Sequence, residues 1–186
     1  MSGDREGLDE SADRWLVDKV RGGDVDAYEV LIRRHRDRIY RIALRMLGNP
    51  HDAEDIAQDV TIQLWTAVSG FLGSASFTTW LYRVVVNRCH NHIRRQARTR
   101  TRAVLDEDPA PAPGADDAAV ARDQAAATMR AIAALPPPLR AALVLVQMEG
   151  LSYREAAEIT DVPEATVRGR LHRARKQLVD HMRSWS

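Results

Sequence analysis

The sequence is poor in cysteine, aromatic residues and long apolar runs, and each shortage narrows what the chain can be. A single cysteine, Cys89, excludes an intramolecular disulfide and is typical of a reducing compartment. No apolar run approaches membrane-spanning length and the N-terminus has no signal-peptide core, so we expect a cytoplasmic protein without membrane insertion. Aromatic residues make up only 5% of the chain and no stretch alternates in hydropathy as a strand does, which predicts an all-α fold.

Catalytic and metal-binding motifs are missing as well. The sequence contains no phosphate-binding loop, no Gly-x-Ser-x-Gly and no His-Glu-x-x-His. Cys89, His90 and His92 are close along the chain, but on a helix Cys89 and His90 point about 100° apart, and no second cluster completes four ligands. We therefore expect no enzyme active site, no metal and no other cofactor.

The net charge of +1 conceals a strong segregation of charge along the chain. Residues 83–102 contain seven arginines and no acid, whereas the N-terminus and the stretch around Asp106 are acidic. Charge separated in this way indicates nucleic-acid contact at the basic segments.

Helical periodicity and chain breakers predict two small helical domains joined by a flexible linker. The linker is rich in Ala, Asp and Pro, a composition that favours an extended chain. The first helix is expected to start at Ser11, with Trp15, Leu16 and Val20 on its apolar side. The predicted segments are a flexible tail (1–10), an N-terminal domain (11–98, with helices near 11–21, 24–47, 51–68 and 77–98), a linker (99–119) and a C-terminal domain (120–186).

The stretch from Gly150 to Leu178 reads as two short helices separated by a tight turn. In the second helix apolar residues recur at i, i+4, i+7 and i+11, which forms one buried stripe. The opposite face has small side chains at its start and basic side chains further on. This helix can therefore enter a DNA major groove as the second helix of a helix-turn-helix. The alternative is an ordinary amphipathic helix pair with a solvated basic face.

Two further helix faces are polar in a patterned way. In the helix near 51–68, Asp52, Asp55 and Asp59 lie on one face with Gln58 beside them, and such a face loses stability unless a basic partner meets it. The alternative is a solvated acidic face near a helix N-terminus. In the helix near 77–98, Asn87 and Asn91 share a face among arginines, which is suited either to base edges or to plain solvation.

Taken together, these segments resemble one family. DAEDIAQDVTIQLW (52–65), followed by FTTWLYRVVVNRCHNHIRR (77–95), resembles region 2 of bacterial extracytoplasmic-function (ECF) sigma factors. LPPPLRAALVLVQMEGLSYREAAEITDVPEATVRGRLHRARKQL (135–178) looks like their region 4. The resemblance covers nearly the whole chain apart from the N-terminal tail and the linker, and the order of the two regions is specific to the family.

The resemblance implies an alternative sigma factor that binds core RNA polymerase, directs it to particular promoters and helps to melt them. It also implies an anti-sigma factor as a regulatory partner, and we expect a monomer when the chain is free. For the clamp helices of the polymerase, the matching positions are Asp52, Asp55, Gln58 and Asp59. For the −10 element they are Ser69, Gly70, Phe71, Leu72, Gly73 and Ser74 of the loop, with Asn87 and Asn91. For the −35 element we expect Ala165, Thr166, Arg168, Gly169, His172 and Arg173.

The sequence departs from the family pattern at several positions. Thr61 and Gln63 stand where the family usually has Phe and a basic residue, and Gly169 replaces a commoner Ser. The basic pair that is frequent at positions 78 and 79 is replaced by two threonines. These changes affect the promoter sequence that we expect the chain to recognise, but not its resemblance to the family.

Other interpretations remain open at this point. The chain could be a helix-turn-helix regulator that binds DNA without polymerase, although this leaves the acidic face of residues 52–59 without a role. An enzyme with an accessory DNA-binding tail is disfavoured because no catalytic constellation is present. Cys89 could sense redox state, but free cysteines are usually buried in helix packing.

Overall fold

The computed structural model describes residues 3–71, 73, 75–102 and 127–183, and every regular element within them is a helix. The expected all-α fold is therefore confirmed for these residues. The expected linker, 99–119, and the start of the C-terminal domain at 120 lie mostly outside them. The N-terminal half consists of α1 (Gly3–Arg21), α2 (Val25–Leu47), α3 (Pro50–Ala67), η1 (Val68–Gly70) and α4 (Phe77–Arg102). The C-terminal half consists of helical residues 127–134, α6 (Pro137–Ala142), η2 (Leu143–Met148), α7 (Tyr153–Thr160) and α8 (Glu164–Arg183).

Helix α1 differs from the sequence prediction at both its start and its buried face. It begins at Gly3 rather than Ser11, so residues 3–10, which were predicted to be a tail, are helical. Trp15 was expected in the apolar stripe, but its side chain is 61% exposed. The buried stripe instead contains Asp13, Leu16, Val17 and Val20. These positions follow i, i+3, i+4 and i+7 spacing, which turns Trp15 toward solvent.

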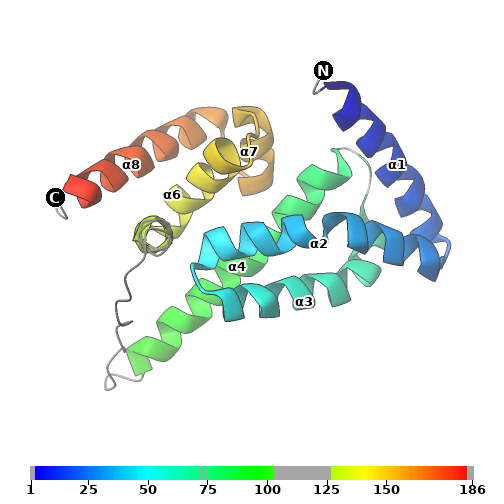
Figure 1. Cartoon of the computed structure of the whole chain (residues 1–186), viewed down its shortest axis with the longest axis horizontal. Helices are drawn as coiled ribbons and strands as arrows, with labels where there is room; N and C mark the ends of the chain where they lie inside the picture. Colours follow the sequence, from blue (N-terminus) through cyan, green and yellow to red (C-terminus); the bar gives the residue numbers. More distant parts are fainter. Residues whose placement is uncertain (1–2, 72, 74, 103–126, 184–186) are drawn as a thin grey trace, which may run out of the picture.

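Helix α2 is the central element of the N-terminal half. Its first turn is capped by Asp24, whose side chain accepts a hydrogen bond of 2.9 Å from the backbone N–H of Ala27. It ends at Gly48, whose φ of +72° is the left-handed conformation that glycine adopts without strain. Its buried face packs against α1, α3 and α4 (Figure 1). Burial of each large side chain in that face stabilises the fold by about 1.5–3 kcal/mol.

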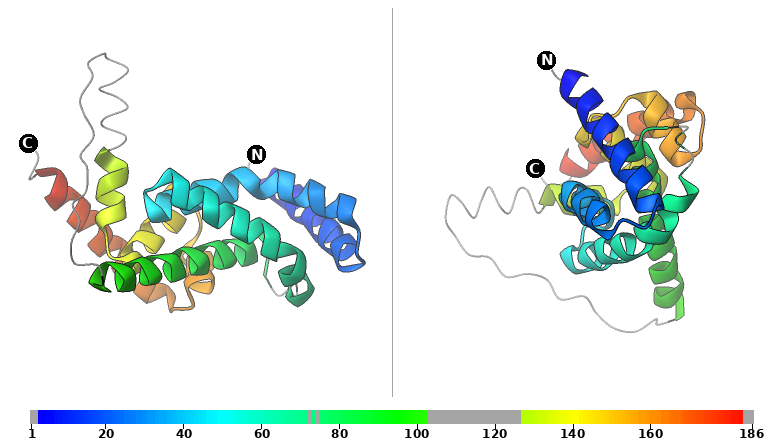
Figure 2. Two further views of the ribbon diagram at one scale, coloured as in Figure 1. Left: turned by 90° about the horizontal axis from the view of Figure 1, so that it is seen from below. Right: turned by 90° about the vertical axis from the view of Figure 1, so that its right-hand side faces the viewer.

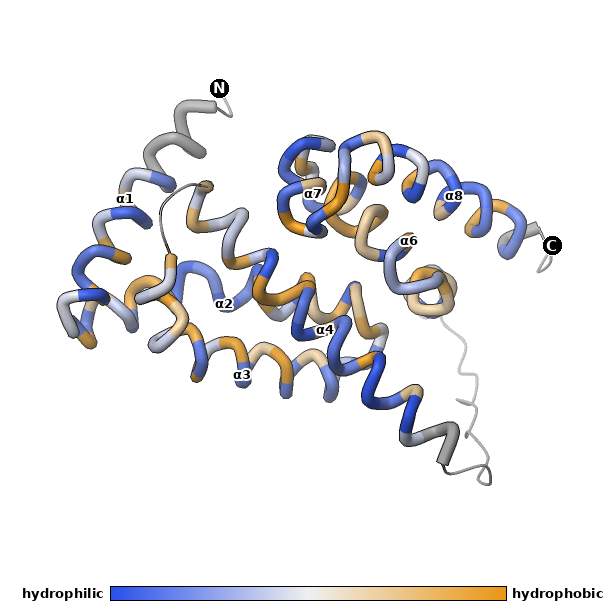
Figure 3. Tube along the Cα trace, turned by 180° about the vertical axis from the view of Figure 1, so that it is seen from behind, coloured by the Kyte–Doolittle hydropathy of each residue, from blue (hydrophilic) through white to orange (hydrophobic). Residues whose placement is uncertain are grey.

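Helices α3 and α4 complete the N-terminal half. The predicted buried stripe of α3 is confirmed, because Ala53, Ile56, Val60 and Leu64 all lie in the core. Buried apolar residues of α2, α3 and α4 belong to one core, and Figure 3 shows strongly hydrophilic turns in the part of α4 beyond it. Helix α4 extends four residues past the predicted end at 98, which carries its basic C-terminal segment away from the core.

The C-terminal half is built around the helix pair that the sequence predicted. A capping box between Ser152 and Glu155 starts α7, and Asp161, at φ +52°, ends it. Pro163 then precedes α8, where its missing N–H costs no hydrogen bond. Before this pair, η2 is a π-helix, in which the backbone N–H of Glu149 bonds five residues back to the carbonyl of Val144 at 2.9 Å.

The two halves pack closely against each other along α2 and α4. One continuous set of buried apolar residues runs from the N-terminal helices into α6, η2, α7 and α8. Helix α7 lies alongside α4 in both views of Figure 2. The backbones approach so closely that a Cβ added at Gly48 would lie 2.5 Å from the Cβ of Ala133. We call this contact between the halves the seam.

Candidate protein and nucleic-acid interfaces

The acidic face of α3 is only partly open to solvent. Asp55 and Asp59 are exposed, and the Asp55 carboxylate lies 3.3 Å from Nδ1 of His51. Asp52 is half-buried and faces α4 instead, where it meets Nε2 of His92 at 3.3 Å and Nε2 of Gln96 at 3.1 Å. The face is therefore divided: Asp55 and Asp59 are exposed to a basic partner, with Asp55 beside His51, whereas Asp52 joins α3 to α4.

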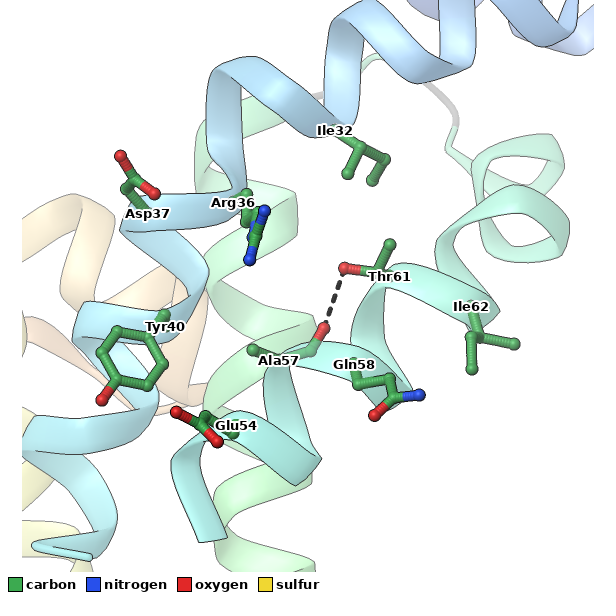
Figure 4. A pocket seen from close by; sticks show the side chains of 9 residues that line it. All are labelled: Ile32, Arg36, Asp37, Tyr40, Glu54, Ala57, Gln58, Thr61 and Ile62. Carbon is green, nitrogen blue, oxygen red and sulfur yellow. Dashed lines mark hydrogen bonds between the residues drawn. The ribbon is translucent and has the colours of Figure 1, made fainter. Parts of the chain in front are cut away.

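Gln58, the fourth residue expected on this face, lines a groove between α2 and α3. The groove has a volume of about 790 Å³ and is formed by both helices (Figure 4). Ile62 contributes an apolar side chain that is 65% exposed at one end. On the α3 wall the hydroxyl of Thr61 donates to the carbonyl of Ala57 at 2.8 Å, so this hydroxyl has its partner within α3. The remaining lining residues are Ile32, Arg36, Asp37, Tyr40 and Glu54.

Three side chains in the first turns of α3 are grouped closely enough to hold a metal ion. Ligand atoms of His51, Asp52 and Asp55 lie within 4.8 Å of one another. Both carboxylates already have protein partners, and the imidazole of His51 is 84% exposed. Of the trio Cys89, His90 and His92 that the sequence analysis weighed and rejected as a metal site, His92 lies against Asp52, whereas Cys89 is fully buried inside the core.

The expected −10 surface consists of a loop and one face of α4. Ser69, Gly70 and Gly73 are exposed, whereas Leu72 and Ser74 lie outside the described residues. Phe71 is buried, and its ring packs edge-on against Phe77 and at a tilt against Trp80, with centroids 5.8 and 5.5 Å away. Phe71 therefore forms the base of the loop. Above it is a pocket of about 380 Å³ lined by Gly70, Phe71, Ala75, Thr79, Trp80, Arg83 and Glu158.

Asn87 and Asn91 are both exposed on α4, on the face where the sequence placed them. The side-chain carbonyl of Asn91 accepts a hydrogen bond from Arg94, one turn further on. An amide whose carbonyl accepts in this way can still donate from its N–H₂, next to guanidinium groups that suit phosphates. This part of α4 can therefore contact a base and the backbone beside it.

The C-terminal helix pair presents a basic face to solvent. Val167, Leu171 and Ala174 are buried, as the periodicity predicted. Arg168 lies over the Tyr153 ring at 5.5 Å and 3.8 Å from Glu164, which orients its guanidinium. Arg173 donates to the carbonyl of Gly169 at 3.3 Å. Ala165, Arg168, Gly169, His172 and Arg173 are exposed and Thr166 is half-buried, so this face is accessible.

Sequence reasoning missed two contributions to these surfaces. The α2 wall of the groove, which includes Ile32 and Tyr40, was not predicted, because the pairing of α2 with α3 has no local signal. Glu158 was missed in the pocket of the loop, because it comes from α7, more than 70 residues away in the chain.

The described residues form a helical fold with a helix-turn-helix in its C-terminal half, an arrangement typical of a class of DNA-binding proteins. None of the described helices is long and apolar enough to span a bilayer. The model of sigma-70 region 2 matches residues 31–99, and that of sigma-70 region 4 matches residues 125–178. Together they cover most of the chain in the expected order.

Known sequences agree with these matches. The chain is 34% identical to the RNA polymerase sigma-H factor of Pseudomonas aeruginosa, over 92% of this chain and 94% of that protein. It is 32% identical to the ECF RNA polymerase sigma factor SigW of Bacillus subtilis, over 90% of this chain and 95% of that protein. It is 38% identical to the ECF RNA polymerase sigma factor SigE of Mycolicibacterium smegmatis, over 84% of this chain but only 62% of that longer protein.

Solved structures share the fold. CnrH, in complex with the cytosolic domain of CnrY, superposes with a TM-score of 0.71 at 24% identity, over 94% of this chain and 99% of that one. The sigma factor RpoE of Bartonella quintana, in complex with the anti-sigma factor NepR, superposes with a TM-score of 0.68 at 22% identity. This match covers 84% of this chain and 96% of that one.

The chain belongs to the extracytoplasmic-function group of the sigma-70 family. It is thus an alternative sigma factor, which directs transcription initiation, and its family consists of initiation factors rather than enzymes.

Proposed function

We propose that three separate surfaces of this chain perform the steps of promoter-specific initiation. The α2–α3 groove with the adjoining acidic face binds core RNA polymerase, the loop with α4 reads the −10 element, and α8 reads the −35 element. The observation that supports this division most strongly is that the three surfaces differ in chemistry. The groove has the exposed apolar Ile62 and carboxylates on the same helix, the pocket of the loop is aromatic, and the exposed side of α8 is basic. Because these partners meet at the promoter, the chain is expected to work in the cytoplasm.

For the polymerase surface, the partner expected from the family is the pair of clamp helices. A helix can lie in the α2–α3 groove and bury Ile62, while Asp55 and Asp59 meet basic side chains at its edge. Gln58 contributes an amide to the wall of the groove, and Asp52 acts mainly by holding α3 against α4 through His92.

For the −10 element, we propose that the pocket of the loop receives one unstacked base. Phe71 and Trp80 provide the aromatic wall on which a base can stack, and Arg83 lies at the rim. Taking a base out of the duplex costs a few kcal/mol, which stacking and hydrogen bonds offset. Asn87 and Asn91 then contact nucleotides beside the captured base.

For the −35 element, we propose that α8 enters the major groove with its N-terminal turns. Arg168 and Arg173 can each donate two hydrogen bonds to a guanine edge. Gly169 has open space around the position of its Cβ, which lets the backbone come close to the DNA. Lys176 and Arg175, further along the exposed side, are suited to the phosphates.

We further propose that an anti-sigma factor holds the chain inactive by covering the polymerase surface. An exposed apolar side chain such as Ile62, next to a groove that fits a helix, can be covered by either partner but not by both. RpoE in complex with the anti-sigma factor NepR is an example of such a pair in a protein that shares the fold.

The test of the polymerase surface is a double charge reversal, Asp55→Lys with Asp59→Lys. Both side chains are exposed, so the variant should fold normally while losing at least tenfold in affinity for sigma-free core polymerase, or about 1.4 kcal/mol. A matched control, Glu10→Lys with Asp18→Lys on α1, changes the net charge equally at other exposed sites. Run-off transcription on genomic fragments with the wild-type chain then gives start sites and aligned promoter elements. Unchanged polymerase binding in the α3 variant would overturn the assignment.

A further inference from the structure

The aromatic wall of the −10 pocket is supported by a ring that is buried beneath it. Phe71 and Trp80 form this wall, and both pack against Phe77, with ring centroids 5.8 and 5.6 Å from that of Phe77. Phe77 is only 2% exposed, so it supports the wall without touching a base. Rings packed in this way hold one another at defined angles. The shape of the pocket therefore depends on the side chains that hold Phe71 and Phe77 from behind.

Helix α1 contacts this wall at Phe71. Arg21, the last residue of α1, donates from Nε to the backbone carbonyl of Val68 in η1 at 3.4 Å. The same carbonyl accepts the backbone N–H of Phe71 at 3.1 Å, in the turn that leads into the loop. The Arg21 guanidinium also lies over the Phe71 ring, with its central carbon 5.9 Å from the ring centroid. One side chain of α1 thus holds both the backbone and the ring at the start of the loop.

A second chain of contacts leads from α1 to Phe77. The Asp13 carboxylate meets Nε2 of His35 at 2.7 Å, and the two side chains are 2% and 3% exposed. The imidazole packs edge-on against Phe77, with the ring centroids 5.3 Å apart. Asp13 and Arg21 lie on the same side of α1, about 12 Å apart along the helix. Two anchors at this separation fix both the rotation and the position of α1 against the wall.

The packing of α1 does not require these polar anchors. Leu16, Val17 and Val20 already bury apolar side chains of α1 in the core. A buried carboxylate adds little stability, because apolar residues of similar size often stabilise a fold as well or better. The loop, by contrast, contains Gly70 and Gly73, which leave its backbone more freedom than other residues would. Ordering this loop before a base arrives saves entropy on binding, and that is a use for two defined anchors.

We propose that α1 is a positioning element for −10 recognition, in which Arg21 and the Asp13–His35 pair hold the aromatic wall in the shape that receives a base. The inference rests on the −10 pocket proposed above and adds the residues that preform it. The region 2 match begins at residue 31, after the end of α1, and the residues expected to contact the −10 element lie within 69–91. Both contacts belong to the N-terminal half and do not involve the seam.

The contact at Phe71 is tested with Arg21→Leu, which removes the donor to η1 and the cation over the ring. Arg21→Lys keeps a cation and a donor, so it should recover part of the effect. The matched control is Arg14→Leu, the same change at a more exposed position of the same helix. Circular dichroism and urea denaturation show whether each variant is folded.

The contact at Phe77 is tested with His35→Gln. This variant keeps an amide N–H₂ as a donor to Asp13 but removes the ring that packs on Phe77. It therefore separates support of the wall from loss of the buried hydrogen bond. If His35→Gln does not fold, the Arg21 variants decide the matter, because the Arg21 side chain is 35% exposed and not part of the core.

The readout is a scan of missing bases with the assembled holoenzyme. Each variant is saturated with core polymerase, and its affinity is measured for a labelled single strand carrying the −10 sequence from the mapped start sites. Removing one base at a time identifies, with the wild-type chain, the position whose base enters the pocket. Loss of a stacked base should weaken binding about 5- to 150-fold there.

The α1 variants should lose affinity only where that base is present. Arg21→Leu and His35→Gln should bind the intact strand about five- to tenfold more weakly than the wild-type chain does. They should bind the strand that lacks the captured base as well as the wild-type chain does. A helix that only stabilised the fold would not distinguish these two strands.

The outcomes separate this inference from the proposed function. If the wild-type chain has no position at which a missing base weakens binding, the −10 pocket is wrong and the role of α1 falls with it. If such a position exists and Arg21→Leu and His35→Gln keep the full wild-type preference for its base, the pocket stands and α1 does not shape it. An equal loss in Arg14→Leu would also overturn the inference, because the effect would then follow the charge of α1 and not the contacts of Arg21.

Discussion

Asp13 on α1 and His35 on α2 are joined by a buried hydrogen bond, with Oδ2 and Nε2 2.7 Å apart. Arg34 donates to the other carboxylate oxygen at 2.7 Å. The carboxylate is therefore fully paired although Asp13 is 2% exposed. Burial acts to raise its pKa, but the hydrogen bonds and charges of His35 and Arg34 outweigh it and hold the pKa below its usual value. An ionised carboxylate only accepts, so Nε2 of His35 is the donor.

Replacing this carboxylate should loosen α1. We expect Asp13→Ala to lower the free energy of unfolding by about 3 kcal/mol, because it leaves His35 buried without a partner. Urea denaturation followed by circular dichroism measures the change. The control is Asp18→Ala, whose exposed pair with Arg21 should contribute less than about 1 kcal/mol. Equal losses in the two variants would contradict this role for Asp13.

The same pair predicts a dependence of stability on pH. Because the folded-state pKa of Asp13 is depressed, its contribution is fully present above the unfolded value of about 4 and is lost as pH falls below it. Unfolding free energies measured between pH 3 and pH 6 should fall more steeply toward acid in the wild-type chain than in Asp13→Asn. Parallel curves would show that Asp13 does not titrate differently in the folded state.

The exposed apolar end of the α2–α3 groove should matter for binding and not for stability. Ile62→Lys places a charge where a partner helix would bury an apolar side chain, so affinity for core polymerase should fall at least tenfold. Thermal stability should change little, because Ile62 is 65% exposed. Val25→Lys, equally exposed at the start of α2, is the matched control. If both variants bind alike, the groove is not the docking surface.

Arg168 and Arg173 on α8 should differ from Lys176 in what they recognise. Arg168→Ala and Arg173→Ala should each weaken −35 duplex binding by about 1–3 kcal/mol and relax the base preference at one position. Lys176→Ala should instead weaken binding to all duplexes alike and lower its dependence on salt. Fluorescence anisotropy with the mapped −35 duplex and its single-base variants measures these affinities. If all three substitutions lower the affinity equally on every duplex, the arginines do not read bases directly.

Cys89 should be unreactive in the folded chain. The thiol is buried in α4, and burial raises its pKa to about 12, so almost no thiolate exists at neutral pH. A chromogenic disulfide reagent at pH 8 should label one thiol in denaturant and essentially none in native buffer. Rapid labelling of the native chain would revive the redox-sensing interpretation.

Local signals predicted most of the helices. Asp24 and Gly48 mark the two ends of α2 because one caps backbone N–H groups and the other adopts a positive φ. The buried stripes of α3 and α8 follow from spacing alone. Trp15 was misplaced because its size suggested burial, whereas the stripe that fits α1 contains the charged Asp13, and only its pairing with His35 makes that burial favourable.

The contacts between the halves could not be predicted in this way. Glu149 and Arg140 look like ordinary charged residues of amphipathic helices, yet both are buried. Their partners lie about a hundred residues earlier in the chain, on α2, and no periodicity relates positions so far apart. Phe71 was expected in a DNA-contacting loop, and its burial depends on Phe77 and Trp80, which follow in the next helix.

The π-helical turn η2 lets the link between the halves tolerate a change in chain length. Glu149 follows directly after this turn and is positioned by its five-residue hydrogen bond to Val144. A π turn holds one residue more than an α turn, so deleting a single residue from 143–148 would convert it to an α turn and leave Glu149 facing Arg45. A second deletion would rotate Glu149 by about 100° away from Arg45, so descendants of this chain could shorten here by one residue, but not by two, without losing this contact with α2.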